Sequence, residues 1–229
     1  MELTVRSLTK DRKEWEDKGF ILPDYDISEI VRNTEASPEW IHFGAGNIFR
    51  GYIACIADDL IRQGLMKSGI IAADCFHTEP IETIFRPYDN LTLLVGLRAK
   101  GSRYLRVIGS VGKACAAVGD GLEELKKAVR CPSLKMISFT ITEKGYATSD
   151  INGNIPAALA QDISKGPESE LSTALGKVSL LLLERFRAGA APVALVSMDN
   201  CSRNGDRLRE GILLTVRGWC GSGLAEQEF

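Results

Sequence analysis

The chain has 229 residues, of which 45% are hydrophobic and 25% are charged, and its formal net charge at pH 7 is −2. This length suits one large domain, or one domain together with part of another. The small net charge excludes a strongly basic surface for nucleic acids or anionic membranes. No apolar run approaches the roughly 18 residues that a membrane-spanning helix needs.

Metal binding finds little support in the sequence. The six cysteines are scattered without a Cys-x-x-Cys pair, and the only histidines are His42 and His77. Zinc sites draw their ligands from such residues at short, regular spacings, so we expect no metal centre. The N-terminus carries no apolar core of a signal peptide. We therefore expect a cytoplasmic protein with free thiols.

The first 38 residues are polar, and Pro23 and Pro38 interrupt them. A few apolar side chains are enough to dock a short segment on a core but not to form a separate one. We predict an irregular N-terminal extension over residues 1–38 and a single domain over residues 39–229.

A glycine-rich stretch follows, with the sequence Trp-Ile-His-Phe-Gly-Ala-Gly-Asn-Ile-Phe-Arg-Gly over residues 40–51. Its first apolar residues predict a strand over Ile41–Phe43, and its glycines predict a tight turn. A helix is predicted from there to about Gln63, with Gly64 ending it. The predicted buried face of this helix has apolar residues at spacings of four, three and four, namely Phe49, Ile53, Ile56 and Leu60.

A strand, a glycine turn and a helix in this order bring backbone N–H groups and the positive end of a helix dipole close to a phosphate. Gly44 would allow the turn, and Gly46 would let a pyrophosphate approach the backbone. Phe49 occupies the position of the third glycine in the usual Gly-x-Gly-x-x-Gly pattern. Arg50, next to Asn47, could neutralise a phosphate or be solvated. We treat these five residues as candidate cofactor-binding residues; the alternative is a glycine turn without a ligand.

The next predicted strand, Gly69–Asp74, ends in a carboxylate. In dinucleotide-binding folds an acidic residue at this place binds the ribose of the adenosine and repels the extra phosphate of NADP. Asp74 lies further from the glycine turn than the usual roughly 20 residues, because the intervening helix is long. A solvated aspartate or a helix cap is the alternative role.

Two apolar-rich segments, Leu91–Arg98 and Arg103–Val111, flank a short link and predict an antiparallel hairpin. The remaining pattern alternates helices and buried strands. It predicts a helix over Gly121–Arg130, a strand over Leu134–Ile141, a loop over 149–170, a helix over Leu171–Arg187, a strand over Pro192–Met198 and a helix from Asp206 to about Trp219. The predicted fold is α/β: a Rossmann-type, doubly wound, mostly parallel sheet with an inserted antiparallel hairpin.

Three blocks together resemble the polyol-specific long-chain dehydrogenases, a family that includes mannitol 2-dehydrogenase, fructuronate reductase and tagaturonate reductase. The first block is Gly44–Gly51. The second, Thr140–Tyr146, is similar to the family's Thr-x-Thr-Glu-x-Gly-Tyr, and the third, Ser197–Gly205, is similar to its Ser-Cys-Asp-Asn-x-x-x-Asn-Gly. The resemblance covers about residues 40–229.

The resemblance implies an N-terminal nucleotide-binding domain, a C-terminal mostly helical domain and metal-free hydride transfer between NAD(P) and a polyol or sugar acid. It implies that Asn200 is a catalytic-site residue whose amide donates to the developing alkoxide. Asp199 and Asn204 would hold their turn or contact the nicotinamide ribose, and Glu143 would line the nicotinamide end. We expect NAD rather than NADP, because of the charge on Asp74.

The family's catalytic lysine has no counterpart in this chain. We therefore expect the cofactor-binding part of an NAD-dependent polyol or uronate dehydrogenase, inactive by itself. The expected substrate is of the mannitol/fructose or mannonate/fructuronate kind, with no nucleic-acid or membrane partner. Two alternatives stay open. A methyltransferase would bind S-adenosylmethionine at a similar glycine turn, and a non-enzymatic sensor would bind a dinucleotide without catalysis.

Overall fold

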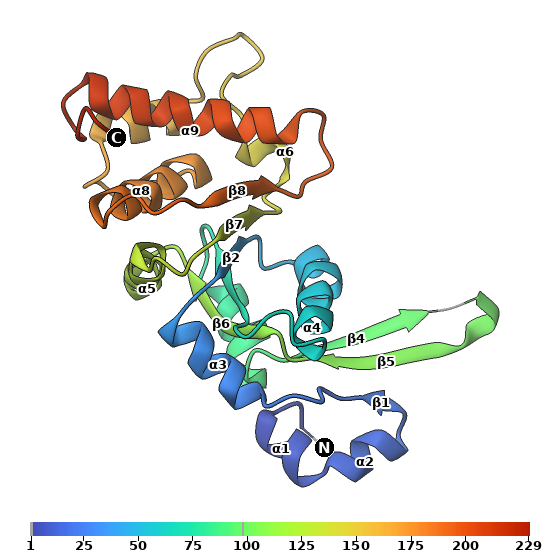
Figure 1. Cartoon of the computed structure of the whole chain (residues 1–229). Helices are drawn as coiled ribbons and strands as arrows, with labels where there is room; N and C mark the ends of the chain where they lie inside the picture. The colour runs from blue at the N-terminus through green and yellow to red at the C-terminus, as the bar shows by residue number, and fades with distance from the viewer. Residues whose placement is uncertain (1, 98) are drawn as a thin grey trace.

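The computed structural model describes residues 2–97 and 99–229 and contains a five-stranded sheet with helices on both faces (Figure 1). The strand order is β6-β3-β2-β7-β8, and every pairing between neighbours is parallel. In chain order these strands are β2 (Trp40–Phe43), β3 (Ile70–Asp74), β6 (Val111–Ala116), β7 (Met136–Phe139) and β8 (Ala194–Ser197). The predicted α/β fold with a parallel sheet is confirmed.

The direction of the winding reverses between β2 and β7. From β2 the chain adds β3 and β6 on one side, and then crosses over to add β7 and β8 on the other side. In open α/β sheets, ligands bind outside the carboxyl ends of the strands at such a reversal. Gly44 follows β2 and Thr140 follows β7, so both lie at this point.

Apart from the buried polar residues His42 and Ser138, the central strands β2 and β7 are apolar on both faces because helices cover both. One core lies beneath α5 and α8 and includes Ile41, Phe43, Ile71, Ala73, Ile137 and Phe139. The alternate residues of β2 and β3 pack on the opposite side, toward α4. β8 differs, since its residues are exposed or only partly buried. It is an edge strand, so the prediction of a buried strand over Pro192–Met198 is right in position and wrong in burial.

The helices after β2 are α4 (Ala54–Arg62), α5 (Gly119–Arg130), α6 (Thr142–Gly145), α7 (Ala157–Lys165), α8 (Ala174–Arg187) and α9 (Asn204–Gly221). The helices predicted over Gly121–Arg130, over Leu171–Arg187 and from Asp206 to about Trp219 are confirmed as α5, α8 and α9, although their ends differ. The predicted loop over residues 149–170 is wrong, because it contains α7. Pro156 precedes that helix, Gly166 ends it at φ +82°, and Leu159 is buried in the core.

The helix after the glycine turn begins at Asn47 and passes through a π-helical turn, η1 (Phe49–Ile53), before α4. A π turn holds more residues than an α turn and so rotates the residues that follow. The buried face therefore continues through Ala57 and Ile61. Ile56, predicted on that face, is 41% exposed, and Leu60 is only partly buried, so this part of the prediction is wrong.

A smaller sheet has the order β1-β5-β4 and consists of β1 (Phe20–Ile21), β4 (Thr92–Leu97) and β5 (Arg103–Ile108). β4 and β5 are antiparallel, which confirms the inserted hairpin. Arg98, the predicted last residue of its first strand, lies outside the described residues. The predicted second strand is too long. β5 ends at Ile108, and Gly109 and Ser110 separate it from β6 of the main sheet, which begins at Val111. The sequence did not predict β6 as a separate strand.

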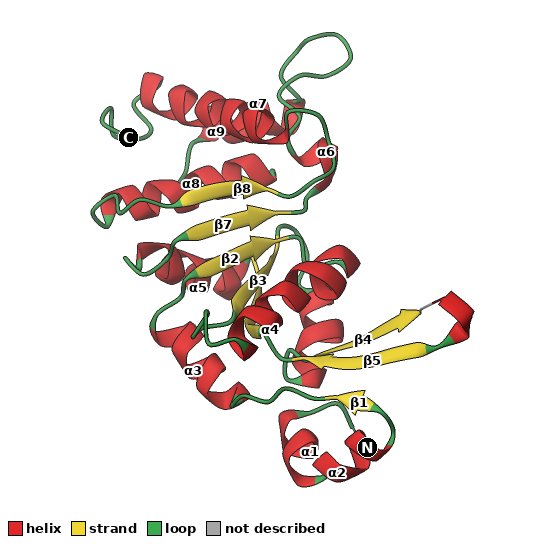
Figure 2. Cartoon of the chain, turned by 45° about the vertical axis from the view of Figure 1, so that its right-hand side comes forward, coloured by secondary structure: helices red, strands yellow, loops and turns green. Residues whose placement is uncertain are grey.

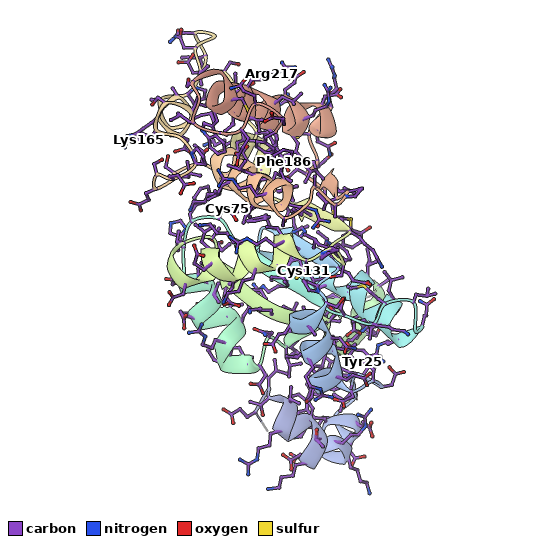
Figure 3. All side chains as sticks on the ribbon, turned by 60° about the vertical axis from the view of Figure 1, so that its left-hand side comes forward. Tyr25, Cys75, Cys131, Lys165, Phe186 and Arg217 are labelled. Atoms are coloured by element: carbon purple, nitrogen blue, oxygen red, sulfur yellow. The ribbon has the colours of Figure 1, made fainter. Side chains whose placement is uncertain are left out.

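Residues 1–38 are largely regular, so the predicted irregular segment is wrong (Figure 2). They form α1 (Val5–Lys10), α2 (Arg12–Asp17), β1 and α3 (Ile27–Ala36). The Tyr25 hydroxyl, labelled in Figure 3, donates to the fully buried carboxylate of Asp58 in α4. Arg62 and Arg106 also donate to Asp58. This buried ionic cluster joins the N-terminal segment to α4 and β5.

Candidate functional site

The two glycines of the turn after β2 are required for different reasons. Gly44 has a φ of +118°, and a Cβ there would collide with the carbonyl and side-chain oxygens of Thr140. The fold itself therefore demands a glycine at this position. Gly46 has no positive φ, and a Cβ there would meet nothing within 4 Å. The fold does not need a glycine at Gly46, whose missing side chain leaves room for a group to approach the backbone.

Asn47 and Arg50 lie side by side at the start of the helix. The Arg50 guanidinium donates through Nη2 to Asn47 Oδ1 at 2.6 Å, and its buried Nε has no hydrogen-bond partner in the described part of the chain. The first N–H groups of a helix have no acceptor within the helix. These unused donors, one cation and the open space at Gly46 together suit a phosphate or pyrophosphate.

The Phe49 side chain is fully buried below the turn. Its ring stacks on the imidazole of His42, with 4.6 Å between centroids and an interplanar angle of 11°. The ring thus belongs to the core, and only the backbone of Phe49 is left for the predicted cofactor contact.

A chain of buried polar side chains supports the glycine turn. The Trp40 indole donates through Nε1 to Ser138 Oγ at 2.7 Å, and Ser138 Oγ lies 2.7 Å from His42 Nδ1. His42 Nε2 lies 2.9 Å from Thr140 Oγ1, which donates to the Gly44 carbonyl at 3.3 Å. Because the indole only donates, the consistent assignment has the serine donating to Nδ1 and Nε2–H donating to the threonine.

Burial lowers the pKa of His42 to about 3, so its imidazole is neutral at pH 7. His42 is thus a hydrogen-bonded strand residue, with Ser138 beside one ring nitrogen and Thr140 beside the other. The supporting roles of Ser138 and Thr140 were missed. The sequence pattern that could have indicated these roles is a pair of polar residues, two positions apart, at the end of an otherwise apolar strand.

Asp74 lies half-buried at the carboxyl end of β3. Its Oδ1 accepts the N–H groups of Phe76 and His77 at 2.9 and 2.8 Å. The carboxylate therefore caps the turn, which is the alternative role considered from the sequence. No described residue forms a hydrogen bond with Oδ2, which leaves this oxygen for a ribose hydroxyl.

A small cavity of about 120 Å³ opens beside this turn, with walls that include Ala117, Leu122 and Lys177. Ala117 donates its N–H to the Asp74 carbonyl at 2.7 Å. The Lys177 amine, whose pKa is lowered by burial, donates to the Cys75 carbonyl at 2.6 Å. A buried lysine thus braces the segment after Asp74, a role that the sequence reading missed and for which it carries no local signal.

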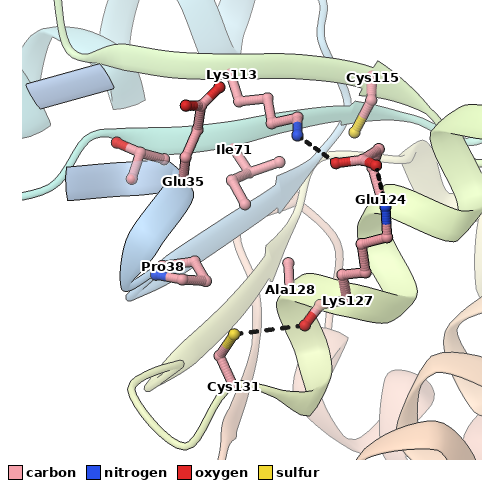
Figure 4. A pocket seen from close by; sticks show the side chains of 10 residues that line it. Glu35, Pro38, Ile71, Lys113, Cys115, Glu124, Lys127, Ala128 and Cys131 are labelled. Carbon is pink, nitrogen blue, oxygen red and sulfur yellow. Dashed lines mark hydrogen bonds and ion pairs between the residues drawn. The ribbon is translucent and has the colours of Figure 1, made fainter. Parts of the chain in front are cut away.

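Larger cavities lie elsewhere, along the free edge of β6. One of about 260 Å³ lies between α3 and α5 (Figure 4), and its wall carries the ion pairs of Glu124 with Lys113 and Lys127. Another of about 410 Å³ lies between β6, α5 and η2 (Ile81–Phe85), and η3 (Arg86–Tyr88) borders it. Neither is lined by a residue of the glycine turn, so cavity size does not mark the predicted site.

The other half of the predicted site lies after β7 and β8. The Asp199 carboxylate accepts the N–H groups of Ile141 at 2.9 Å and Thr142 at 3.1 Å. The Asn204 amide donates to the Asp199 carbonyl at 2.8 Å. Both residues thus hold the turn, the first of their two predicted roles.

Asn200 and Glu143 are both exposed at this end of the sheet. The Asn200 side chain has no hydrogen bond to a described residue, so its amide is free to bind a ligand. The Glu143 carboxylate pairs with Arg207 of α9. All the predicted site residues therefore lie at the carboxyl ends of β2, β3, β7 and β8.

Among residues 2–97 and 99–229, no group of three His, Cys, Asp or Glu side chains is placed to hold a metal ion. No helix in these ranges has both the length and the apolar character that crossing a membrane requires. All six cysteines are free thiols.

Residues 38–220 match the protein-family model of the mannitol dehydrogenase Rossmann domain. The chain belongs to the mannitol dehydrogenase family. It is 41% identical to the D-mannonate oxidoreductase of Thermotoga maritima over 228 residues, which is 98% of this chain and 42% of that protein. It is 30% identical to the polyol:NADP oxidoreductase of Gluconobacter oxydans, covering 83% of this chain and 39% of that one.

Two solved structures have a fold similar to that of this chain. The mannitol 2-dehydrogenase of Pseudomonas fluorescens, in a ternary complex with NAD and D-mannitol, superposes with a TM-score of 0.78 at 25% identity, over 95% of this chain and 42% of that chain. A D-sorbitol dehydrogenase in substrate-free form gives a TM-score of 0.74 at 27% identity, over 86% of this chain and 40% of that chain. The chain thus spans about 40% of the length of these relatives.

Proposed function

We propose that this chain binds NAD(H) across the carboxyl edge of its parallel sheet. The pyrophosphate would bind at the Gly44–Arg50 turn, the adenosine half over β3 and the nicotinamide half over β7 and β8. One observation carries this proposal: the backbone at Gly46 is open at the start of the helix, because a Cβ there would meet no described atom within 4 Å, and Arg50 follows one turn later. In dinucleotide-binding folds a glycine at this position lets the pyrophosphate approach the backbone.

The proposed preference for NAD over NADP depends on Asp74. Its Oδ2 is available to a ribose hydroxyl, and its negative charge would repel the additional phosphate of NADP. The names of the relatives do not decide this point, because one solved relative holds NAD and another relative is named for NADP. The argument therefore depends on the carboxylate of this chain.

The proposed reaction is hydride transfer between the cofactor and a polyol or sugar acid, of the mannitol/fructose or mannonate/fructuronate kind, in the cytoplasm. The similarity to a D-mannonate oxidoreductase and to a mannitol complex supports this substrate class. NAD, when bound, supplies the hydride acceptor. The exposed amide of Asn200 would donate a hydrogen bond to the oxygen on the reacting carbon. No lysine here matches the family's catalytic motif, so the chain alone would bind the cofactor without turnover.

Ligand binding to the purified chain tests this proposal. Thermal unfolding is measured with NADH, NADPH or S-adenosylmethionine at equal concentrations. We expect NADH to raise the Tm most, since a ligand stabilises the state that binds it. Stabilisation by S-adenosylmethionine alone would favour the methyltransferase alternative. In a parallel assay, NADH oxidation with fructuronate should be absent, and measurable turnover would contradict the assignment of the acid/base lysine outside this chain.

A further inference from the structure

The turn after β7 contains an unusual backbone conformation. Thr142 has a φ of +67°, in the left-handed region that a β-branched residue rarely adopts. Its N–H donates to Asp199 Oδ1 at 3.1 Å, and the N–H of Ile141 donates to Oδ2 of the same carboxylate at 2.9 Å. A carboxylate from the turn after β8 thus holds this strained turn in place.

A buried tyrosine holds that carboxylate. The Tyr146 side chain is almost completely buried, and its hydroxyl donates to Asp199 Oδ2. The same hydroxyl accepts a hydrogen bond from Ser197 Oγ at 2.9 Å. Tyr146 is therefore bonded to the end of β8 and to the turn that follows it, while its own backbone follows β7.

Asn204 completes the arrangement by donating to the Asp199 carbonyl at 2.8 Å. The two turns at the ends of β7 and β8 are therefore fixed relative to each other through one carboxylate. Asn200 is the next residue in the chain and is exposed above this fixed base. The orientation of its amide depends on a backbone that Asp199 and Asn204 hold.

We propose that Tyr146 is a positioning residue which, through Asp199, holds the nicotinamide side of the site in its binding geometry before the cofactor arrives. The inference rests on the proposed function, in that NAD(H) must bind here. It adds a residue without direct ligand contact whose hydroxyl matters for one half of the dinucleotide only. The pyrophosphate turn and Asp74 do not share this hydrogen-bond cluster.

The test compares NADH with ADP, which lacks both the nicotinamide and its ribose. Kd values for the two ligands are measured by calorimetry on the full chain and on Tyr146→Phe. This substitution removes only the hydroxyl. We expect the Kd for NADH to rise about tenfold, the typical effect of losing one hydrogen bond to a charged group. The Kd for ADP should stay within about twofold, because ADP has no group that reaches the turns after β7 and β8. A purely structural defect would instead weaken both ligands.

Tyr88→Phe is the matched control, because Tyr88 is exposed and lies in η3. It should change neither Kd. Asp199→Asn keeps the size of the side chain but replaces one acceptor oxygen by a donor, and it should weaken NADH more than Tyr146→Phe does. The shift of NADH fluorescence on binding should also shrink in both site variants.

The outcomes separate the two proposals. If the unmodified chain binds neither NADH nor ADP, the proposed function is wrong. If it binds both ligands but Tyr146→Phe weakens them equally, or weakens neither, the positioning role of Tyr146 is wrong and the proposed function stands.

Discussion

The imidazole Nε2 of His42 lies 2.9 Å from the Thr140 hydroxyl, and this contact joins β2, the first strand of the parallel sheet, to the residue that follows β7. The Thr140 hydroxyl in turn donates a hydrogen bond to the carbonyl of Gly44, in the glycine turn. The backbone that would face a pyrophosphate is thus held from below by a neutral, buried histidine. The burial of this histidine also makes the stability of the fold sensitive to pH.

Stability should fall as the pH drops below 6.5. Burial lowers the pKa of His42 from 6.5 to about 3, so between these values the unfolded chain binds a proton that the folded chain does not. From pH 7 to pH 5 this one group should cost about 2 kcal/mol of the free energy of unfolding, at about 1.4 kcal/mol per pH unit. Urea denaturation at both pH values measures the loss.

The contribution of His42 is isolated by comparing variants. His42→Gln keeps polar atoms in the same place but does not titrate, so its loss between pH 7 and pH 5 should be smaller by about 2 kcal/mol. His77→Gln changes the only other histidine, which is exposed, and should behave like the unmodified chain. An equal loss in His42→Gln and the unmodified chain would contradict this assignment.

Arg185→Lys should destabilise the chain strongly. The buried guanidinium of Arg185 donates to five backbone carbonyls, those of Val129, Cys131, Leu134, Ala191 and Pro192. An ammonium has three donors and cannot reach all five. Leaving at least two of these buried or partly buried carbonyls unpaired should lower the free energy of unfolding by about 3 kcal/mol. Arg187→Lys, on the more exposed face of the same helix, should cost less than about 1 kcal/mol, and equal effects would refute the claim.

Asp74→Asn should reduce the discrimination between NADH and NADPH. The amide oxygen can still accept the N–H groups of Phe76 and His77, so the turn is kept while the charge is removed. The ratio of the two Kd values should shift toward NADPH by about tenfold, since one unit of charge repulsion is lost. Glu79→Gln removes an exposed charge nearby and should leave the ratio unchanged. A ratio that does not move in Asp74→Asn would show that the carboxylate only caps its turn.

Local patterns were enough to predict the parts of the fold that local chemistry determines. Short-range sequence patterns predicted the apolar run before Gly44, the glycine turn and the carboxylate at the end of β3. The structure has the predicted strands and turn there. The end of β5 has no such signal, because the break at Gly109 accompanies a hydrogen bond from its N–H to the buried Asp58. The strand β6 therefore could not be separated from the hairpin by periodicity.

In the candidate site, too, residues with a local sequence pattern were predicted and residues with distant partners were not. Turn residues such as Asn204 were predicted from the resemblance of Ser197–Gly205 to a family block, and their hold on the turn agrees with the preference of asparagine and aspartate for turns. Lys177 and Tyr146 were assigned no role because their partners lie far away in the sequence, at Cys75 and Asp199. The rotation of the helix face after Phe49 also escaped the sequence reading, since a π turn leaves the apolar spacing looking α-helical.

The claim that the glycine turn binds the dinucleotide is tested most directly by adding one methyl group at Gly46. Gly46→Ala puts a Cβ into space that no described residue occupies, so the free energy of unfolding should change by no more than about 1 kcal/mol. Gly221→Ala, at another exposed glycine without nearby atoms, is the control for adding a methyl group. We predict that the Kd for NADH rises at least about tenfold in Gly46→Ala and is unchanged in Gly221→Ala. An unchanged NADH affinity in a folded Gly46→Ala variant would contradict the account.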